Sequence, residues 1–284
     1  MSSDAKCEVP DLPLHPEAAV RLGGFLIVFA AVALWELARP RRPATTSKRL
    51  RWRHNLALAA INALIVRAVF PLAAVGAAVA AASRGWGVFN NVSITALIAV
   101  PASVVVLDLV VWLQHRLFHA IPVLWRLHRV HHADVDFDVT TGLRFHPLEM
   151  LISMLIKMAV ITVLGAPVLA VLVFELLLNA TSMFNHANAG LPSRIERWVR
   201  RLIVTPDMHR IHHSIAADEM NRNFGFNLSL WDRCFGTYRE APRGGNDGMT
   251  IGLSAWRGPT AIITLPRLLD MPFRREPAAT PGSA

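Results

Sequence analysis

Residues 92–132, VSITALIAVPASVVVLDLVVWLQHRLFHAIPVLWRLHRVHH, join an apolar stretch directly to a run of histidines. Residues 92–113 carry a single charge, at Asp108. A helix that crosses a membrane needs about 20 mostly apolar residues, so this stretch predicts a crossing. Five histidines follow between His115 and His132. The segment therefore predicts a membrane helix that ends in a histidine cluster.

Three further stretches are apolar enough to lie in a membrane. Residues 22–38 and 56–82 predict two more crossings. Residues 150–183 predict a hairpin broken at residues 165–167, because glycine and proline end helices. Each arm of the hairpin reaches only about 24 Å, short of a ~30 Å membrane core. Either the arms extend into their polar flanks or the hairpin does not fully cross.

Composition agrees with a membrane protein. Hydrophobic residues make up 53% of the 284-residue chain and charged residues 17%, against roughly 25% charged in ordinary soluble domains. An ordinary soluble enzyme and a disordered chain are both disfavoured. Two distant cysteines offer neither a disulfide framework nor a cysteine metal cluster. We expect no cleavable signal peptide, because residues 1–20 lack a basic region followed by an apolar run.

The expected fold is all-α. It is an integral-membrane bundle of about four to five apolar helices that carries a histidine-rich helical cap. We predict an N-terminal segment at residues 1–21 and the membrane domain at residues 22–240. Residues 241–284 form a C-terminal segment that is partly disordered, from about Glu276.

Basic residues predict the orientation of the bundle. The loop after the first crossing holds seven lysines and arginines between Arg39 and Arg53, and no acid. The positive-inside rule places this loop in the cytosol and the N-terminus outside. The third crossing then returns the chain to the cytosolic side just before His115. Ten of the 12 histidines lie between His115 and His213, so we expect all ten at the cytosolic face.

Histidine spacing indicates metal binding. One H-x-x-x-H pair and two H-x-x-H-H triplets each project their imidazoles from one helical face. Eight clustered imidazoles would repel one another when protonated and would be costly to bury without a cation. One site takes three or four such ligands, so the set predicts two metals. The eight residues are His115, His119, His128, His131, His132, His209, His212 and His213.

These motifs resemble those of the fatty acid hydroxylase/sterol desaturase superfamily of integral-membrane di-iron proteins. The likeness extends to residues 136–149, 185–192 and 223–238, and it covers roughly residues 50–240. It implies that the eight histidines hold two irons, which activate O₂ to hydroxylate, desaturate or cleave a lipid. Zinc can replace iron after overexpression. His186 lies between the second and third histidine motifs and is expected as a ninth ligand.

Five further residues are weaker candidates. His146 is either a ligand or supporting residue, or simply the start of a helix before Pro147. Metal-bound histidines usually donate their second N–H to a carboxylate or carbonyl, which suggests nearby acids as supporting partners. Asp108 shares a helical stripe with His115, and a charge in an apolar helix needs a partner. Asp136 and Asp138 are also supporting candidates, with a solvated loop as the alternative, and Asn188 is a further supporting candidate.

The expected function is O₂-dependent oxidation of a C–H bond in a lipid. The chain has no dinucleotide-binding, haem-attachment or iron–sulfur motif, so electrons must come from a separate reductase, ferredoxin or cytochrome. The alternatives are a desaturase, an ether-lipid monooxygenase, and a metal transport or storage protein. A transporter would place ionisable residues along a path through the membrane, whereas these histidines cluster outside the apolar stretches. We expect no nucleic-acid partner.

Overall fold

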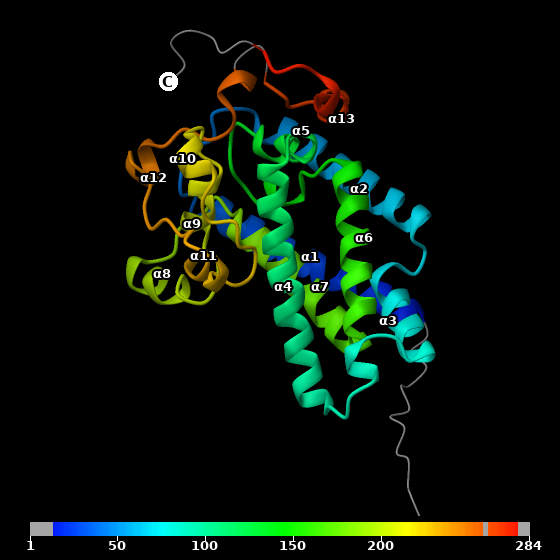
Figure 1. Ribbon diagram of the computed structural model, residues 1–284. Coiled ribbons are helices and arrows are strands. Elements are labelled where there is room, and N and C mark those ends of the chain that lie inside the picture. The colour runs from blue at the N-terminus through cyan, green and yellow to red at the C-terminus, as the bar shows by residue number, and fades with distance from the viewer. Residues whose placement is uncertain (1–13, 258–260, 278–284) are drawn as a thin grey trace, which may run out of the picture.

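The computed structural model describes residues 14–257 and 261–277, and it is helical (Figure 1). In the described part no β-strand forms, and β-type pairing is limited to three isolated bridges. The predicted all-α class is confirmed. The bundle consists of α1 (Leu14–Ala38), α2 (Lys48–Val69), α3 (Ala73–Arg84), η1 (Val88–Asn90), α4 (Ala96–Ala120), α6 (Pro147–Leu164) and α7 (Val168–Asn185).

Five stretches are long and apolar enough to cross a membrane, as the sequence predicts. The chain is therefore an integral membrane protein. The stretches are Ala19–Ala38, Lys48–Asn90, Ala96–Ala120, Pro147–Leu164 and Val168–Asn185.

The second stretch is two helices rather than the single predicted one. α2 ends at Val69 and α3 starts at Ala73, on either side of Pro71. Proline lacks the N–H that the helix needs and its ring crowds the preceding turn, so the break falls there.

The hairpin arms are longer than predicted. α6 and α7 have 18 residues each, which corresponds to about 27 Å and nearly matches a ~30 Å core. Each arm gains its extra length in the polar flanks, at Pro147 and at Asn185. Gly165 ends α6 with a left-handed φ of 66°, which glycine adopts without strain.

The interior of the bundle is mainly apolar, with a few buried charged side chains. α3, α4, α6 and α7 share a cluster of buried residues that includes Leu107 and Phe174. Glu175 of α7 pairs with Lys157 at 3.1 Å and with Arg21 at 2.5 Å. Charges inside a membrane are costly unless they pair, and these three neutralise one another in part.

The remaining elements form a helical layer at one end of the bundle (Figure 1). We call residues 121–146, 186–257 and 261–277 the cap. Its elements are α5 (Pro122–His132), η2 (Thr141–Leu143), α8 (Ser193–Val199), α9 (Pro206–His212), α10 (Ala217–Met220), α11 (Leu230–Cys234), α12 (Gly245–Gly248), η3 (Ser254–Trp256), α13 (Leu265–Asp270) and η5 (Met271–Phe273).

The C-terminal segment packs against α2 and α5 through its described part. Trp256, Leu268 and Met271 share a buried cluster with Leu58 of α2 and Val130 of α5. The predicted disordered tail from about Glu276 falls largely in residues 278–284, outside the described residues.

Buried ion pairs hold the basic loop at the cap end of the bundle. Arg51, 1% exposed, donates to Asp134 at 2.6 and 2.7 Å and to Asp138 at 2.5 Å. The backbone N–H of Arg41 donates to the carbonyl of Asn188 at 2.9 Å. The arginine-rich loop and the histidines therefore lie at the same end, as the orientation argument requires.

Candidate metal centre

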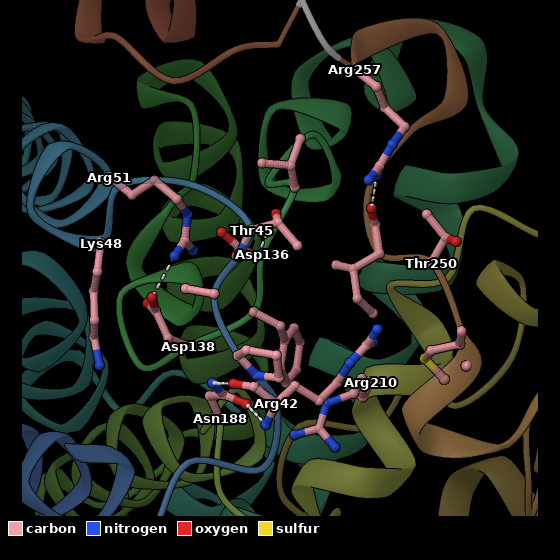
Figure 2. Close-up of a pocket in the computed structure, with 17 residues that line it drawn as sticks. Arg42, Thr45, Lys48, Arg51, Asp136, Asp138, Asn188, Arg210, Thr250 and Arg257 are labelled. Atoms are coloured by element: carbon pink, nitrogen blue, oxygen red, sulfur yellow. Dashed lines mark hydrogen bonds and ion pairs between the residues drawn. The ribbon is translucent and has the colours of Figure 1, made fainter. Parts of the chain in front are cut away.

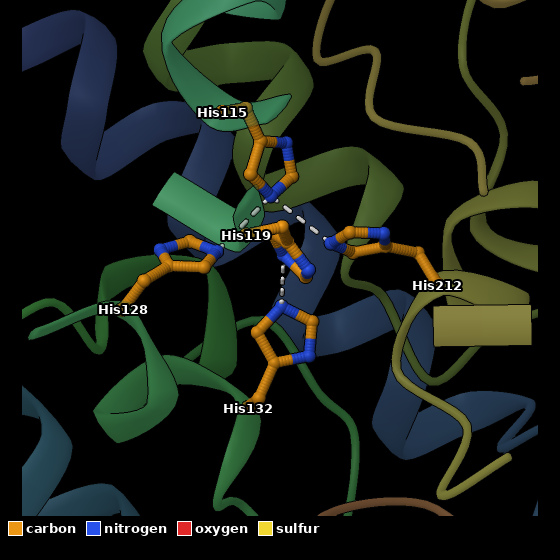
Figure 3. Close-up of side chains that lie close together, drawn as sticks. All are labelled: His115, His119, His128, His132 and His212. Carbon is orange, nitrogen blue, oxygen red and sulfur yellow. Dashed lines mark hydrogen bonds between the residues drawn. The ribbon is translucent and has the colours of Figure 1, made fainter. Parts of the chain in front are cut away.

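Nine histidines converge where the end of α4 meets the cap, and they form two adjacent groups. Within each group the ligand atoms all lie within 4.8 Å of one another. Figure 3 shows the first group, whose rings turn toward a common centre. It comprises His115, His119, His128, His132 and His212, and the second group comprises His131, His186, His209 and His213. The structure thus brings together the eight motif histidines and His186, as the sequence predicts.

Three short helical segments deliver the motif histidines. The last two turns of α4 carry the H-x-x-x-H pair. The ends of α5 and α9 carry one triplet each, and both of these helices start with proline at the first turn, which suits its fixed φ. The members of each triplet divide between the two groups. His212 joins the first group, while His209 and His213 join the second.

Backbone carbonyls fix the tautomers of three imidazoles. The Nδ1 of His115 lies 2.7 Å from the carbonyl oxygen of Phe224, and the Nδ1 of His212 lies 2.8 Å from that of Arg222. In the second group, the Nδ1 of His186 lies 2.7 Å from the carbonyl of Ser182. A carbonyl can only accept, so Nδ1 carries the hydrogen in each case.

In the first group, Nε2 atoms that carry lone pairs therefore face one another. A neutral imidazole has one N–H, so the Nε2 atoms of His115 and His212 are both acceptors, yet they lie 3.0 Å apart. The Nε2 of His128 also lies 3.0 Å from that of His115. Nitrogens that ligate one ion at about 2.1 Å lie about 3.0–3.4 Å apart. The arrangement lacks a hydrogen bond between these atoms and fits a shared cation.

The second group also contains ring nitrogens that lie close together or lack a hydrogen-bond partner. The Nε2 atoms of His131 and His186 lie 3.1 Å apart. Both ring nitrogens of His213 are buried and find no hydrogen-bond partner in the described part of the chain. Buried polar atoms nearly always have partners, so these nitrogens fit a bound metal.

Burial keeps the imidazoles neutral. It lowers the pKa of His128 and of His186 to about 3. Burial, with the neighbouring imidazoles, lowers the pKa of His131 and His213 well below the usual value. A neutral imidazole offers the lone pair that a metal ion needs.

Aromatic rings enclose the two groups. Phe145 stacks on His131, with ring centroids 4.4 Å apart, and Phe137 stacks on His186 at 5.3 Å. Phe224 packs edge-on against His119 at 5.1 Å. Such a wall excludes water and strengthens electrostatic interactions inside it.

The supporting carboxylates differ from those predicted. Asp108 accepts from the indole N–H of Trp231 at 2.8 Å and from the backbone of Leu228 at 3.2 Å. It therefore anchors the loop before α11 rather than a histidine. Seven helical residues separate it from His115, about 10 Å along the axis, which is too far for contact.

The remaining predicted partners also serve the cap scaffold. Asp136 accepts from Thr45 and Thr46, and Asp138 accepts from Arg51, Trp52 and Thr140. The side chain of Asn188 pairs with the backbone of Arg42. Both acids miss the imidazoles because the chain turns toward α2 after the first triplet.

His146 lies outside both groups. Its Nδ1 accepts from the backbone N–H of Leu148 at 3.2 Å and so caps α6, while its Nε2 lies 3.2 Å from the carbonyl of Leu269. This geometry favours the helix-start interpretation over the ligand interpretation.

Glu149 is the contact that the sequence analysis missed. Its Oε1 lies 2.7 Å from the Nδ1 of His128, and the side chain is buried in the first turn of α6. It is the one carboxylate that contacts a grouped histidine in the described residues. An acid at the start of an otherwise apolar helix was the available signal, since such a charge needs a partner.

Replacing Glu149 with glutamine is expected to weaken metal binding by about 10–100-fold, because the amide loses the charge that orients His128 and raises its basicity. Metal titration of the purified variant measures the effect. The exposed Glu240 gives the matched control, and Glu240→Gln should bind metal normally. Equal metal affinity in both variants would exclude a supporting role for Glu149.

Comparisons with known proteins agree with the motifs. The sequence model of the fatty acid hydroxylase family matches residues 100–237. Ornithine lipid hydroxylase of Rhizobium tropici is 30% identical over 167 residues, which is 57% of this chain and 50% of the relative. Alkylglycerol monooxygenase of Homo sapiens is 27% identical over 144 residues, or 49% of this chain and 29% of the relative.

The similarity covers only part of this chain and part of each relative. The chain spans half or less of the length of these curated relatives. Alkylglycerol monooxygenase of Xenopus tropicalis shows the same pattern, with 28% identity over 44% of this chain and 27% of the relative. No solved structure matches at a significant level.

Proposed function

Because this chain belongs to the fatty acid hydroxylase superfamily through residues 100–237, we propose that it is a membrane-bound oxidase that hydroxylates a lipid with O₂ and external electrons. The observation that carries the proposal is the pair of histidine groups with facing Nε2 atoms. An all-nitrogen donor set suits iron, zinc, copper or nickel, and the family favours iron. We propose one iron for each group.

The chain's own residues orient and shield the metal ligands. Carbonyls of Phe224, Arg222 and Ser182 hold three imidazoles with Nε2 inward, and Glu149 holds a fourth. The aromatic wall excludes water from the same space. Two irons bound there would supply the strong oxidant that breaking an unactivated C–H bond requires.

A lipid is the substrate that fits this placement. The first group lies at the end of α4, where an apolar membrane helix meets the cap. A lipid chain dissolved in the bilayer can reach such a position without leaving the membrane. The nine grouped histidines lie at one end of the bundle, so they do not line a path across it as a metal transporter requires. The likeness to alkylglycerol monooxygenases favours ether-lipid oxidation as a second candidate, and desaturation is a third outcome of the same chemistry.

Lipid profiling tests the proposal. Cells that express the protein under oxygen should accumulate a lipid that has gained one oxygen atom, and cells that express His212→Ala should not. His146→Asn is the matched control, because asparagine can cap α6 and the position lies outside both groups. A lipid that has lost two hydrogens indicates desaturation, and a cleaved ether lipid indicates the second candidate. An unchanged lipid profile together with altered cellular metal content would favour metal transport.

The histidine centre is also proposed to face the cytosol. A reporter fused to the C-terminus should be cytosolic and one at the N-terminus external, because five crossings separate the ends and the Arg39–Arg53 loop follows the positive-inside rule. Reporter fusions measure this directly. Both ends on one side would mean that one arm of the hairpin does not cross, and inverted ends would place the centre outside.

A further inference from the structure

A cavity of about 200 Å³ lies where the loop before α2 and the start of α2 meet the cap (Figure 2). Its lining includes Phe137, whose ring stacks on His186 and contacts that of His213, with ring centroids 5.0 Å apart. Met249 and Ile251 pack with Phe137 in one buried apolar cluster. The cavity has room for several waters at about 30 Å³ each, so a small polar ligand also fits.

The lining of this cavity is rich in arginine. It contains five cationic side chains and two acids. Three of the cations are already paired: Arg51 with Asp134 and Asp138, Lys48 with Glu36, and Arg210 with Asp207. Both acids are already occupied, Asp136 by two threonines and Asp138 by Arg51. Figure 2 shows Arg257 at the opposite end from Arg42 and Arg210. The cationic residues are Arg42, Lys48, Arg51, Arg210 and Arg257.

Two of the arginines hold buried nitrogens that lack an acceptor. The Nη1 of Arg42 and the Nε of Arg210 have no hydrogen-bond partner among the described residues. Arg210 is 0% exposed, and its other nitrogens bond Asp207 at 2.6 Å and the carbonyl of Ala187 at 3.1 Å. A buried cationic N–H without an acceptor is costly, so the cavity favours an incoming oxygen atom.

We propose that this cavity binds a phosphate group. The planar fork of arginine matches phosphate oxygens, and Arg42 and Arg210, each with an unpartnered buried nitrogen, lie at the same end of the cavity (Figure 2). The apolar part of the lining, formed by Phe137, Met249 and Ile251, accommodates the carbon portion of the ligand. The phosphate belongs to a lipid headgroup or to a soluble molecule, and this site stands independently of the proposed lipid oxidation.

Native mass spectrometry of the purified full-length protein in detergent tests the site with three probes. Phosphatidic acid represents a lipid phosphate, glycerol 3-phosphate a soluble one, and diacylglycerol is the matched lipid without phosphate. Arg42→Gln should weaken phosphate binding about tenfold or more, because it removes a charged donor. Arg49→Gln is the matched control, since Arg49 is an exposed arginine of the neighbouring helix α2.

Each outcome decides the proposal. Binding of phosphatidic acid alone assigns the site to a lipid headgroup, and binding of glycerol 3-phosphate assigns it to a soluble ligand. Absence of both, equal binding of diacylglycerol, or equal weakening by Arg49→Gln would overturn it. Metal content and the thermal midpoint, measured on the same samples, show whether Arg42→Gln remains folded. If it does not, Arg42→Lys provides the second variant, because lysine keeps the charge but lacks the planar fork and should also weaken phosphate binding.

Discussion

Replacing His212 with alanine is expected to remove one of two bound metal ions and to lower lipid turnover by more than about 100-fold. Replacing a residue that merely supports a ligand typically costs 10–100-fold in metal affinity or activity, so losing a ligand should cost more. The Nε2 of His212 lies 3.0 Å from the Nε2 of His115, which itself lies 3.0 Å from the Nε2 of His128. His213→Ala should remove the other ion, because His213 belongs to the second group.

Metal analysis of purified protein measures this prediction, with turnover determined on the same sample. His146→Asn should keep both ions and full activity. Zinc in place of iron after overexpression is consistent with two metal sites, because such sites generally bind Zn²⁺ more tightly than Fe²⁺. One ion per active wild-type chain, or unchanged metal content in His212→Ala, would refute the division of the histidines into two metal sites.

Replacing Arg51 with methionine is expected to destabilise the fold by about 3–5 kcal/mol, because it leaves the buried carboxylates of Asp134 and Asp138 without their main partner. Arg51 joins the start of α2 to the segment after the first histidine triplet, with donor–acceptor distances of 2.5–2.7 Å. By the usual relation, the thermal midpoint should fall by ~6 °C or more.

Thermal unfolding in detergent measures this loss. Arg49→Met removes the same charge from the exposed face of α2 and should leave the midpoint nearly unchanged. Equal midpoints for the two variants would show that the buried ion pairs do not hold the cap on the bundle. Metal content of Arg51→Met, measured below its midpoint, shows whether the histidine groups also depend on this anchor.

The bundle and the clustering of the histidines could be predicted because both follow from local periodicity, whereas the division of each triplet between the two groups could not. Apolar runs of about 20 residues set the spans, and i, i+3, i+4 spacing sets which imidazoles share a face. The break at Pro71 was also readable, since proline interrupts helices, although the sequence analysis treated that stretch as one crossing.

The partners of the imidazoles could not be predicted, because they come from distant segments. His115 bonds a carbonyl at Phe224, and no local pattern specifies which backbone atom will face it. The structure shows instead that an acid supports His115 indirectly, through the backbone carbonyl that His115 bonds. The carboxylate of Asp232 accepts from the backbone N–H of Phe224 at 2.8 Å and from the indole of Trp112 at 3.1 Å, which fixes that carbonyl beside α4. Acids near a motif in sequence, such as Asp136, are drawn away by stronger tertiary partners.

Labelling with heavy dioxygen tests the central claim most directly. The purified, iron-loaded protein, supplied with an electron donor and the lipid found by profiling, should incorporate one oxygen atom from O₂ into the product. Omitting the donor or the O₂ should abolish turnover, because the chain carries no redox motif of its own. A product that carries an unlabelled oxygen atom, or turnover that continues without O₂, would contradict the assignment of this chain as a lipid hydroxylase.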